Sequence, residues 1–247
     1  MYFFEAKSEI KSPKHAYILA TAGLIIVLTY KLWKYFLRIG IDPIIDYYAY
    51  EAGATCFRVL GTLMGLFLIR WAYTKPRAQL KIGNHLIGFV NILIIIPLFF
   101  LFRSQYFVFA LNTWHFGIEL FFNFFVGTFE ELMFRGALFA SLFYFLGVAR
   151  AALLSSLIFS LWHLDVTTDV SSLFFMFLYG VFDCYCYYLG ATLLSLSIFH
   201  FLWDQVRYGI QWQGYFESNE VTQMMGLYSL VAVIIILLIT KKLEKRS

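Results

Sequence analysis

Three short sets of ionisable side chains lie inside strongly apolar stretches of this chain. An ionised side chain costs roughly 2.5–3.5 kcal/mol at the centre of a bilayer, and such groups inside a membrane are functional by default. A chain that needed only an anchor would not carry them, so we take all three sets as candidate site residues. They are Glu130, Glu131 and Arg135 in the first set, His163 in the second, and His200 with Asp204 in the third.

The first set, Glu130-Glu131-x-x-x-Arg135, has a spacing that suits a helix. Glu131 and Arg135 are four residues apart, so they share a helix face and can form an ion pair. Glu130 is rotated about 100° from Glu131 around the helix axis. One carboxylate is therefore held by the arginine while the other is left for chemistry. The structural alternative is an ion-pair cluster that locks two transmembrane helices together.

The histidine sets are weaker signals when each is taken alone. A single His163 near the end of an apolar run is most often a packed or interfacial residue. His200 and Asp204 share one helix face, and a structural hydrogen bond would explain that pair. Three such sets on three separate apolar runs are harder to dismiss, because a bundle would hide them in one shared interior cavity. A carboxylate in such an apolar cavity can serve as a general base for a hydrolytic water.

The composition indicates a polytopic helical membrane protein, because 61% of the 247 residues are hydrophobic and only 14% are charged. The net charge of +4 is spread over tails and loops, which indicates membrane topology rather than nucleic-acid binding. The basic run from Lys31 to Arg38 is expected at the membrane interface, with snorkelling lysines. Cys56, Cys184 and Cys186 all lie in apolar runs, so we interpret them as packing residues without disulfides.

The apolar runs predict an all-α bundle of about eight transmembrane spans in one membrane domain, residues 1–247. The expected spans are about 16–37, 52–73, 86–102, 115–146, 151–164, 172–189, 191–206 and 224–240. The run 115–146 is too long for one crossing of about 20 residues, so we expect it to tilt or to break near Gly136. Eight spans place both termini on one side, and the basic tails favour the cytoplasm.

The three motifs in this order resemble the CPBP family, the CAAX proteases and bacteriocin-processing enzymes also called the ABI family. Glu130-Glu131-x-x-x-Arg135 resembles its first motif, Phe159-x-x-x-His163 its second, and His200-x-x-x-Asp204 its third. The resemblance covers a motif-bearing core of about 116–206. One position departs from many members, which end the third motif in Asn.

The resemblance implies an intramembrane glutamic-type endopeptidase. The Glu-rich first motif offers a base without a metal, so we expect no cofactor. The resemblance also implies that Glu130 and His163 activate the water, and that His200 and Asp204 stabilise the tetrahedral oxyanion. Glu131 and Arg135 would pair to fix the helix and bias Glu130. An ionised Asp204 cannot donate a hydrogen bond, so it would have to be protonated or to orient His200 instead.

Other chemistries stay open on the residues alone. Two histidines and a carboxylate could bind zinc in a metal-dependent protease, although the His-Glu-x-x-His helix of zincins does not occur. Asp183 follows Gly180-Val-Phe rather than the Gly-x-Gly of aspartyl types, and we expect it to line the cavity. The same buried ionisable groups could serve a membrane transporter. A non-proteolytic immunity or scaffold protein is a further alternative.

The resemblance permits several partners. The expected substrate is a peptide or the C-terminal segment of a membrane-associated protein: a prenylated C-terminus, a bacteriocin leader or a membrane-anchor sorting signal. No nucleic-acid partner is expected, and the bilayer itself is the other partner. We expect a multi-pass integral membrane protein, in a bacterial or archaeal cytoplasmic membrane.

Overall fold

The computed structural model describes residues 10–42, 46–76, 113–165, 169–208 and residue 231. This part of the chain is helical and contains no strand beyond one isolated bridge between Ile10 and Tyr73. The all-α prediction is therefore confirmed for these residues. The elements are α2 (Pro13–Gly40), α3 (Tyr47–Ala72), α5 (Thr113–Glu130), the π-helix η3 (Glu131–Phe139), α6 (Ala140–Leu146), α7 (Val148–Trp162), the 3₁₀ turn η4 (His163–Asp165), α8 (Val170–Tyr188) and α9 (Leu193–Tyr208).

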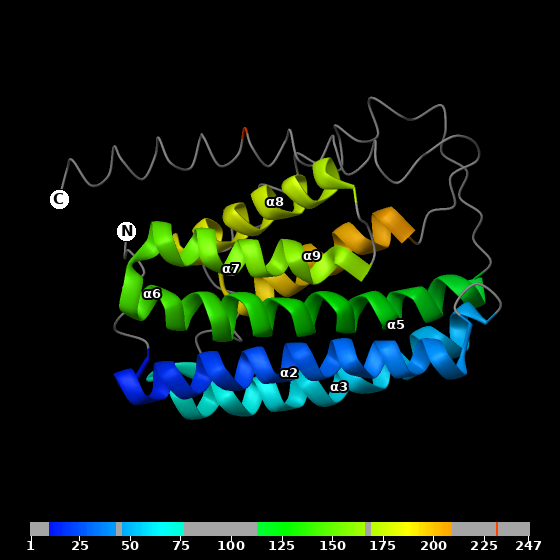
Figure 1. Ribbon diagram of the computed structural model, residues 1–247, viewed down its shortest axis with the longest axis horizontal. Coiled ribbons are helices and arrows are strands. Elements are labelled where there is room, and N and C mark those ends of the chain that lie inside the picture. Colours follow the sequence, from blue (N-terminus) through cyan, green and yellow to red (C-terminus); the bar gives the residue numbers. More distant parts are fainter. Residues whose placement is uncertain (1–9, 43–45, 77–112, 166–168, 209–230, 232–247) are drawn as a thin grey trace.

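The helices stack in three layers (Figure 1). Helices α2 and α3 form an antiparallel pair, and both contact η3 in the middle layer. The middle layer is the continuous run of α5, η3 and α6, which carries the first motif. Helices α7, α8 and α9 form the third layer, where α7 packs on α8 and α9 packs on α5. The middle run therefore contacts every other helix that positions the predicted site.

Helix ends coincide with capping residues, which explains why the elements begin and end where they do. Asp46 and Asp169 each cap a helix by accepting a backbone N–H from three residues later, at 3.0 and 2.8 Å. Thr192 and Ser195 bond reciprocally at the start of α9. Gly147, with φ of +77°, forms the sharp turn between α6 and α7.

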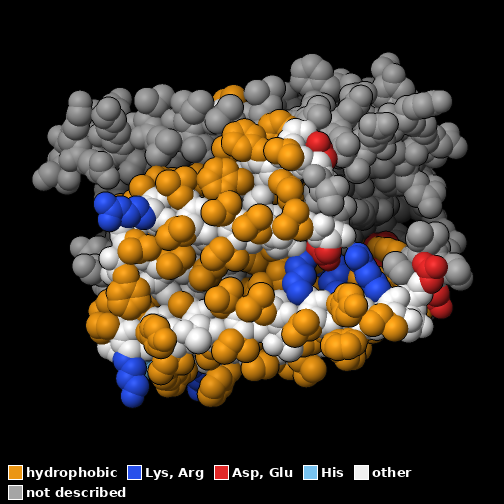
Figure 2. Space-filling view, viewed as in Figure 1, with side chains coloured by type: hydrophobic (Ala, Val, Ile, Leu, Met, Phe, Trp, Pro, Cys, Tyr) orange, Lys and Arg blue, Asp and Glu red, His pale blue; other side chains and the backbone are white. Residues whose placement is uncertain are grey.

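Helices α2, α3 and α8 are each long and apolar enough to cross a membrane. Figure 2 shows apolar side chains over most of the described part of one face, as lipid contact requires. Six of the predicted spans coincide with helices, but the span predicted at 86–102, and that at 224–240 except for residue 231, lie outside the described residues. The total of eight spans and the single domain therefore stay predictions.

The middle run does not break near Gly136, which corrects the alternative that we expected from its length. It widens instead into a π-helix from Glu131 to Phe139, and all nine residues of this π-helix are buried. The hydroxyl of Tyr73, the residue that follows α3, donates to the Gly136 carbonyl at 2.7 Å and so supplies a partner to a carbonyl of the widened turns. Helical segments of this kind occur frequently at functional sites.

Gly127 allows the helices of the first and third motifs to touch. A Cβ built at Gly127 would lie 2.8 Å from the backbone nitrogen of Phe201 and 3.1 Å from the carbonyl oxygen of Ser197. Such close backbone approach is typical of small residues between membrane helices. The contact places α9, and with it His200, directly against α5.

We predict that Gly127→Ala forces α5 and α9 apart and lowers the free energy of unfolding by about 1–3 kcal/mol, the usual range for overpacking. Thermal unfolding in detergent measures the effect. Gly117→Ala on the same helix is the matched control, because a Cβ there meets nothing within 4 Å. Equal unfolding temperatures for the two variants would contradict the close contact between α5 and α9.

Candidate active site

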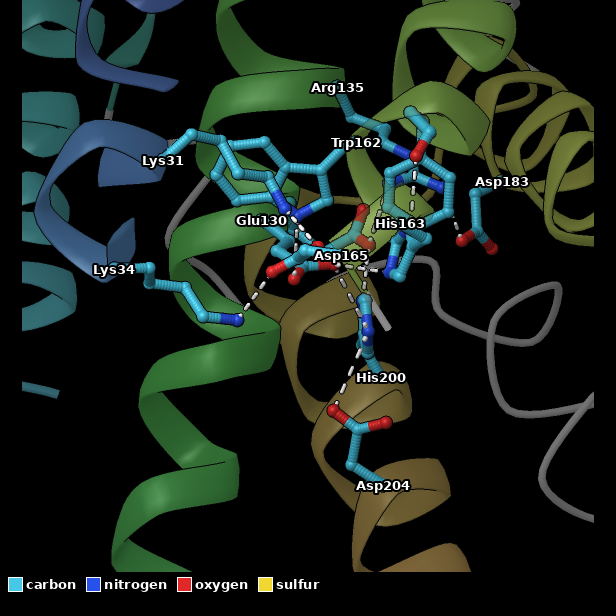
Figure 3. A network of polar contacts seen from close by, with 12 residues as sticks. Lys31, Lys34, Glu130, Arg135, Trp162, His163, Asp165, Asp183, His200 and Asp204 are labelled. Atoms are coloured by element: carbon cyan, nitrogen blue, oxygen red, sulfur yellow. Dashed lines mark hydrogen bonds and ion pairs between the residues drawn. The ribbon is translucent and has the colours of Figure 1, made fainter. Parts of the chain in front are cut away.

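The structure brings together the four residues predicted to be catalytic (Figure 3). Glu130 ends α5, His163 begins η4, and His200 and Asp204 lie one turn apart on α9. The Oε2 atom of Glu130 lies 3.9 Å from Nε2 of His163 and 3.7 Å from Nε2 of His200. The Oδ2 atom of Asp204 lies 3.7 Å from the same nitrogen of His200. Two carboxylates and two imidazoles from three separate elements therefore face one small volume.

The partners of the two Nδ1 atoms define which ring nitrogens face that volume. Nδ1 of His163 lies 2.8 Å from the Phe159 carbonyl oxygen, which can only accept, so Nδ1 carries the proton. In the neutral ring, Nε2 then presents a lone pair toward Glu130. Nδ1 of His200 lies 2.8 Å from Oε1 of Glu131 and donates to that carboxylate. Each imidazole is thus fixed by one nitrogen and turns the other toward the site.

A buried ion network lies behind the histidines. Nη1 of Arg135 lies 3.2 Å from Oε1 of Glu131, and Nη2 donates to Oδ2 of Asp183 at 2.8 Å. The exposed fraction of each of these side chains is 1% or less. The guanidinium also lies over the ring of Phe159, 4.5 Å from its centroid. The network joins η3 to α8, and through Glu131 and His200 to α9.

One expectation needs correction here. Asp183 was expected to line the cavity, but it is fully buried in its pair with Arg135 and is absent from the pocket lining. Glu131 was expected to pair with Arg135, and it also contacts His200 directly. The i,i+4 ion pair between Glu131 and Arg135 is present as predicted.

Trp162 contacts the site, although the sequence analysis did not single it out. Its Nε1–H donates to Oε1 of Glu130 at 3.3 Å, which leaves Oε2 turned toward the histidines. The indole stacks on the ring of Tyr30 at 5.3 Å, and the Lys31 ammonium lies over it at 3.9 Å. The only signal in the sequence is its position next to His163, and 21% of the chain is aromatic.

The four predicted catalytic residues line a pocket of about 370 Å³. Its opposite wall comes from α2 and α3, which the sequence analysis had left without a functional role. The other lining residues are Tyr30, Lys31, Lys34, Arg38, Tyr47, Tyr50, Glu51, Arg58, Asn123, Val126, Trp162 and Asp165. The basic run from Lys31 to Arg38, interpreted as an interfacial segment, thus contributes three side chains to the pocket.

Asp165 ties α2 to the end of α7 beside the pocket. It forms ion pairs with Lys31 and with Lys34, the latter at 2.7 Å, and its carbonyl accepts from Arg38 at 3.3 Å. Partial burial alone would raise the pKa of Asp165, but the ammonium groups of Lys34 and Lys31 lower it to about 2. The carboxylate is therefore ionised near neutral pH. Figure 2 shows a group of basic and acidic side chains that interrupts the apolar surface above α2.

Within the described ranges, no group of three or more His, Cys, Asp and Glu side chains is arranged to hold a metal ion. Each histidine at the site has its Nδ1 committed to a carbonyl or a carboxylate, so only the Nε2 atoms face the pocket side of the cluster.

Residues 112–206 match the family model described as type II CAAX prenyl endopeptidase Rce1-like. The match covers less than half of the chain, and it spans all three motifs. No curated protein and no solved structure matches the chain.

The match confirms the resemblance to the CAAX protease family that the three motifs predicted. The protein is thus an enzyme of the peptide hydrolase class. Together with the apolar helices, this assigns it to the integral membrane proteins.

We predict that Asp183→Leu destabilises the protein by about 3–5 kcal/mol, because it leaves the buried Arg135 undercompensated. The free energy of unfolding in detergent is the quantity to measure. The double variant Arg135→Met/Asp183→Leu should be less destabilised than the sum of the two single variants, since contacting residues couple by 0.5–3 kcal/mol. If the destabilisation of the double variant equalled the sum of the two single variants, the ion pair between these residues would be contradicted.

Proposed function

We propose that this protein is an intramembrane endopeptidase in which Glu130 and His163 activate the hydrolytic water. The observation that carries the proposal is the position of Oε2 of Glu130. This buried oxygen has no hydrogen-bond partner among the described residues, yet it faces Nε2 of both histidines at 3.9 and 3.7 Å. These separations exceed a direct hydrogen bond and are of the size that one water molecule bridges.

The reaction follows from these positions. A water placed between Glu130 and His163 donates a hydrogen bond to each of them. As the water oxygen attacks the carbonyl carbon of the scissile peptide bond, one of its protons passes to the Glu130 carboxylate and the other stays on the attacking oxygen. The carbonyl oxygen becomes an oxyanion as the new C–O bond forms. The proton taken from the water then passes to the leaving nitrogen, the C–N bond breaks, and a carboxylate and an amine are released.

His200 is the proposed oxyanion donor. Three carboxylates face its ring, those of Glu130, Glu131 and Asp204, and together they favour the imidazolium form. Its Nε2–H is then a charged donor for the developing oxyanion. Asp204 needs no proton in this arrangement, because its role is to orient and stabilise the His200 ring. This choice favours the second of the two roles that the sequence left open for Asp204.

The proposed substrate is the prenylated C-terminal segment of a membrane-associated protein. The family description supports it, since it names CAAX prenyl endopeptidases. The exposed apolar surfaces of the helices are compatible with lateral entry of a prenyl chain from the bilayer. We keep a bacterial or archaeal cytoplasmic membrane as the proposed location.

We further propose that the hydrolysis needs no metal ion, with the zinc-dependent protease as the alternative. A carboxylate placed to act as base against a bridging water supports the metal-free reaction. Activity that falls in chelator and returns with added zinc would favour the alternative. Ion flux in sealed vesicles without any peptide product would instead favour a transporter.

We predict that Glu130→Gln and His163→Gln each lower kcat/KM by about 10²–10⁴-fold, the usual contribution of a general base. The assay is cleavage of a quenched peptide that ends in S-farnesylcysteine and three aliphatic residues, by protein purified in detergent. Glu119→Gln on the same helix is the control, because the Glu119 carboxylate accepts from Tyr47 and lies outside the pocket lining. Near wild-type cleavage by the Glu130 variant would remove the base from this mechanism.

We predict that Trp162→Phe lowers kcat by about 10–100-fold with little change in KM, because a hydrogen bond to a charged group contributes about 1.5–3 kcal/mol. Phenylalanine keeps the aromatic stacking but cannot hold Oε1 of Glu130. Trp33→Phe is the control, since it also loses an indole hydrogen bond, to the Gly53 carbonyl at 2.9 Å. An increase in KM with unchanged kcat would mean that Trp162 only lines the pocket and does not position Glu130 for the reaction.

A further inference from the structure

The α2–α3 wall of the pocket holds polar groups that the proposed hydrolysis does not use. The side chains of Tyr30 and Tyr50 are 3% and 4% exposed, and both line the pocket. Neither hydroxyl has a hydrogen-bond partner in the part of the chain that the structure describes. A buried hydroxyl without a partner costs free energy, so two of them at one pocket indicate a ligand that accepts from them.

Arg58 lies on the same wall and is also buried, with 7% of its surface exposed. Its Nη1 donates to Glu51 at 2.8 Å and to Thr55 at 3.2 Å. Its other N–H groups form no hydrogen bond with the described residues, and its guanidinium lies over the Tyr30 ring at 5.5 Å. The remaining N–H donors of the guanidinium, together with the two phenol hydroxyls, can donate hydrogen bonds to the oxygens of a carboxylate.

The charges of this wall also favour an anion. It carries four basic side chains, Lys31, Lys34, Arg38 and Arg58, and one acidic side chain, Glu51, while Glu130, Asp165 and Asp204 line the rest of the pocket. Lys31 and Lys34 share Asp165, and Arg58 pairs with Glu51. Among the described residues Arg38 hydrogen-bonds to a carbonyl oxygen and pairs with no carboxylate, so its charge is left for an anion in the pocket.

We propose that Tyr30, Tyr50 and Arg58, with Arg38 at the edge, form a subsite for the free C-terminal carboxylate of the peptide substrate. The proposal rests on the proposed function and deepens it, because it states which end of the substrate is read. The subsite and the catalytic cluster line one pocket of about 370 Å³, which holds a short peptide segment. The bond that is cleaved therefore lies a few residues from the C-terminus.

The experiment measures binding rather than cleavage, in the full-length Glu130→Gln variant in detergent micelles. The probe is a fluorescent peptide that ends in S-farnesylcysteine and three aliphatic residues, made as the free acid and as the C-terminal amide. We expect the acid to bind about tenfold or more tightly than the amide by fluorescence anisotropy, the size of a hydrogen-bonded charge interaction. Equal binding of the two peptides, or binding of neither, overturns the subsite.

Substitutions test which residues cause the preference for the free acid over the amide. Tyr50→Phe and Arg58→Gln should each reduce the preference for the acid, while Tyr35→Phe and Arg70→Gln, which change exposed side chains on the same two helices, leave it unchanged. Arg58→Gln/Glu51→Gln removes both members of the ion pair and guards against misfolding caused by an unpaired Glu51. Weaker binding of acid and amide alike, with an unchanged ratio, would overturn the assignment to these residues.

A third peptide distinguishes binding of the C-terminal carboxylate from binding of a side-chain carboxylate. It ends in an amide but carries glutamate as its last residue. Binding of this peptide as tight as that of the free acid would assign the site to a side-chain carboxylate and overturn the C-terminal assignment. The proposed hydrolysis is tested separately by the cleavage assay, so either proposal can fail without the other.

Discussion

The fold of the site depends on one buried cation, the guanidinium of Arg135, which lies between the carboxylates of Glu131 and Asp183. Inside a membrane no water can replace either partner, so each charge requires the others to be in place. Glu131 reaches onward to His200, and the same contacts thereby fix η3, α8 and α9 relative to one another. The orientation of the His200 ring is thus a consequence of charge compensation in the interior.

The sequence predicted the parts of this arrangement that depend on residues close together in the chain. The four-residue spacing predicted the pair of Glu131 and Arg135, and the helical rotation predicted that Glu130 would face elsewhere. The cost of ions in a membrane predicted that separate apolar runs would turn their ionisable groups toward one volume. The roles of the four predicted catalytic residues came from the family resemblance, and they stay predictions until activity is measured.

The contacts that sequence reasoning missed are those between residues far apart in the chain. Nothing in the residue types alone could decide whether Asp183 lines a cavity or pairs with Arg135. Lys31, Lys34 and Arg38 have the composition of an interfacial segment, and only the packing of α2 against η3 and α7 places them at the pocket. The π-helix has no sequence rule of its own, and its Gly136 was interpreted as a break.

The two walls of the pocket come from different parts of the chain. The acidic and imidazole groups belong to the segment that matches the family, whereas the facing tyrosines and arginines come from α2 and α3, which precede it. In the proposed reaction, bond breaking and the choice of which molecule enters are carried by separate stretches of polypeptide. Exchanging α2 and α3 for a differently charged pair offers a route to retarget such an enzyme while its reactive centre is kept intact.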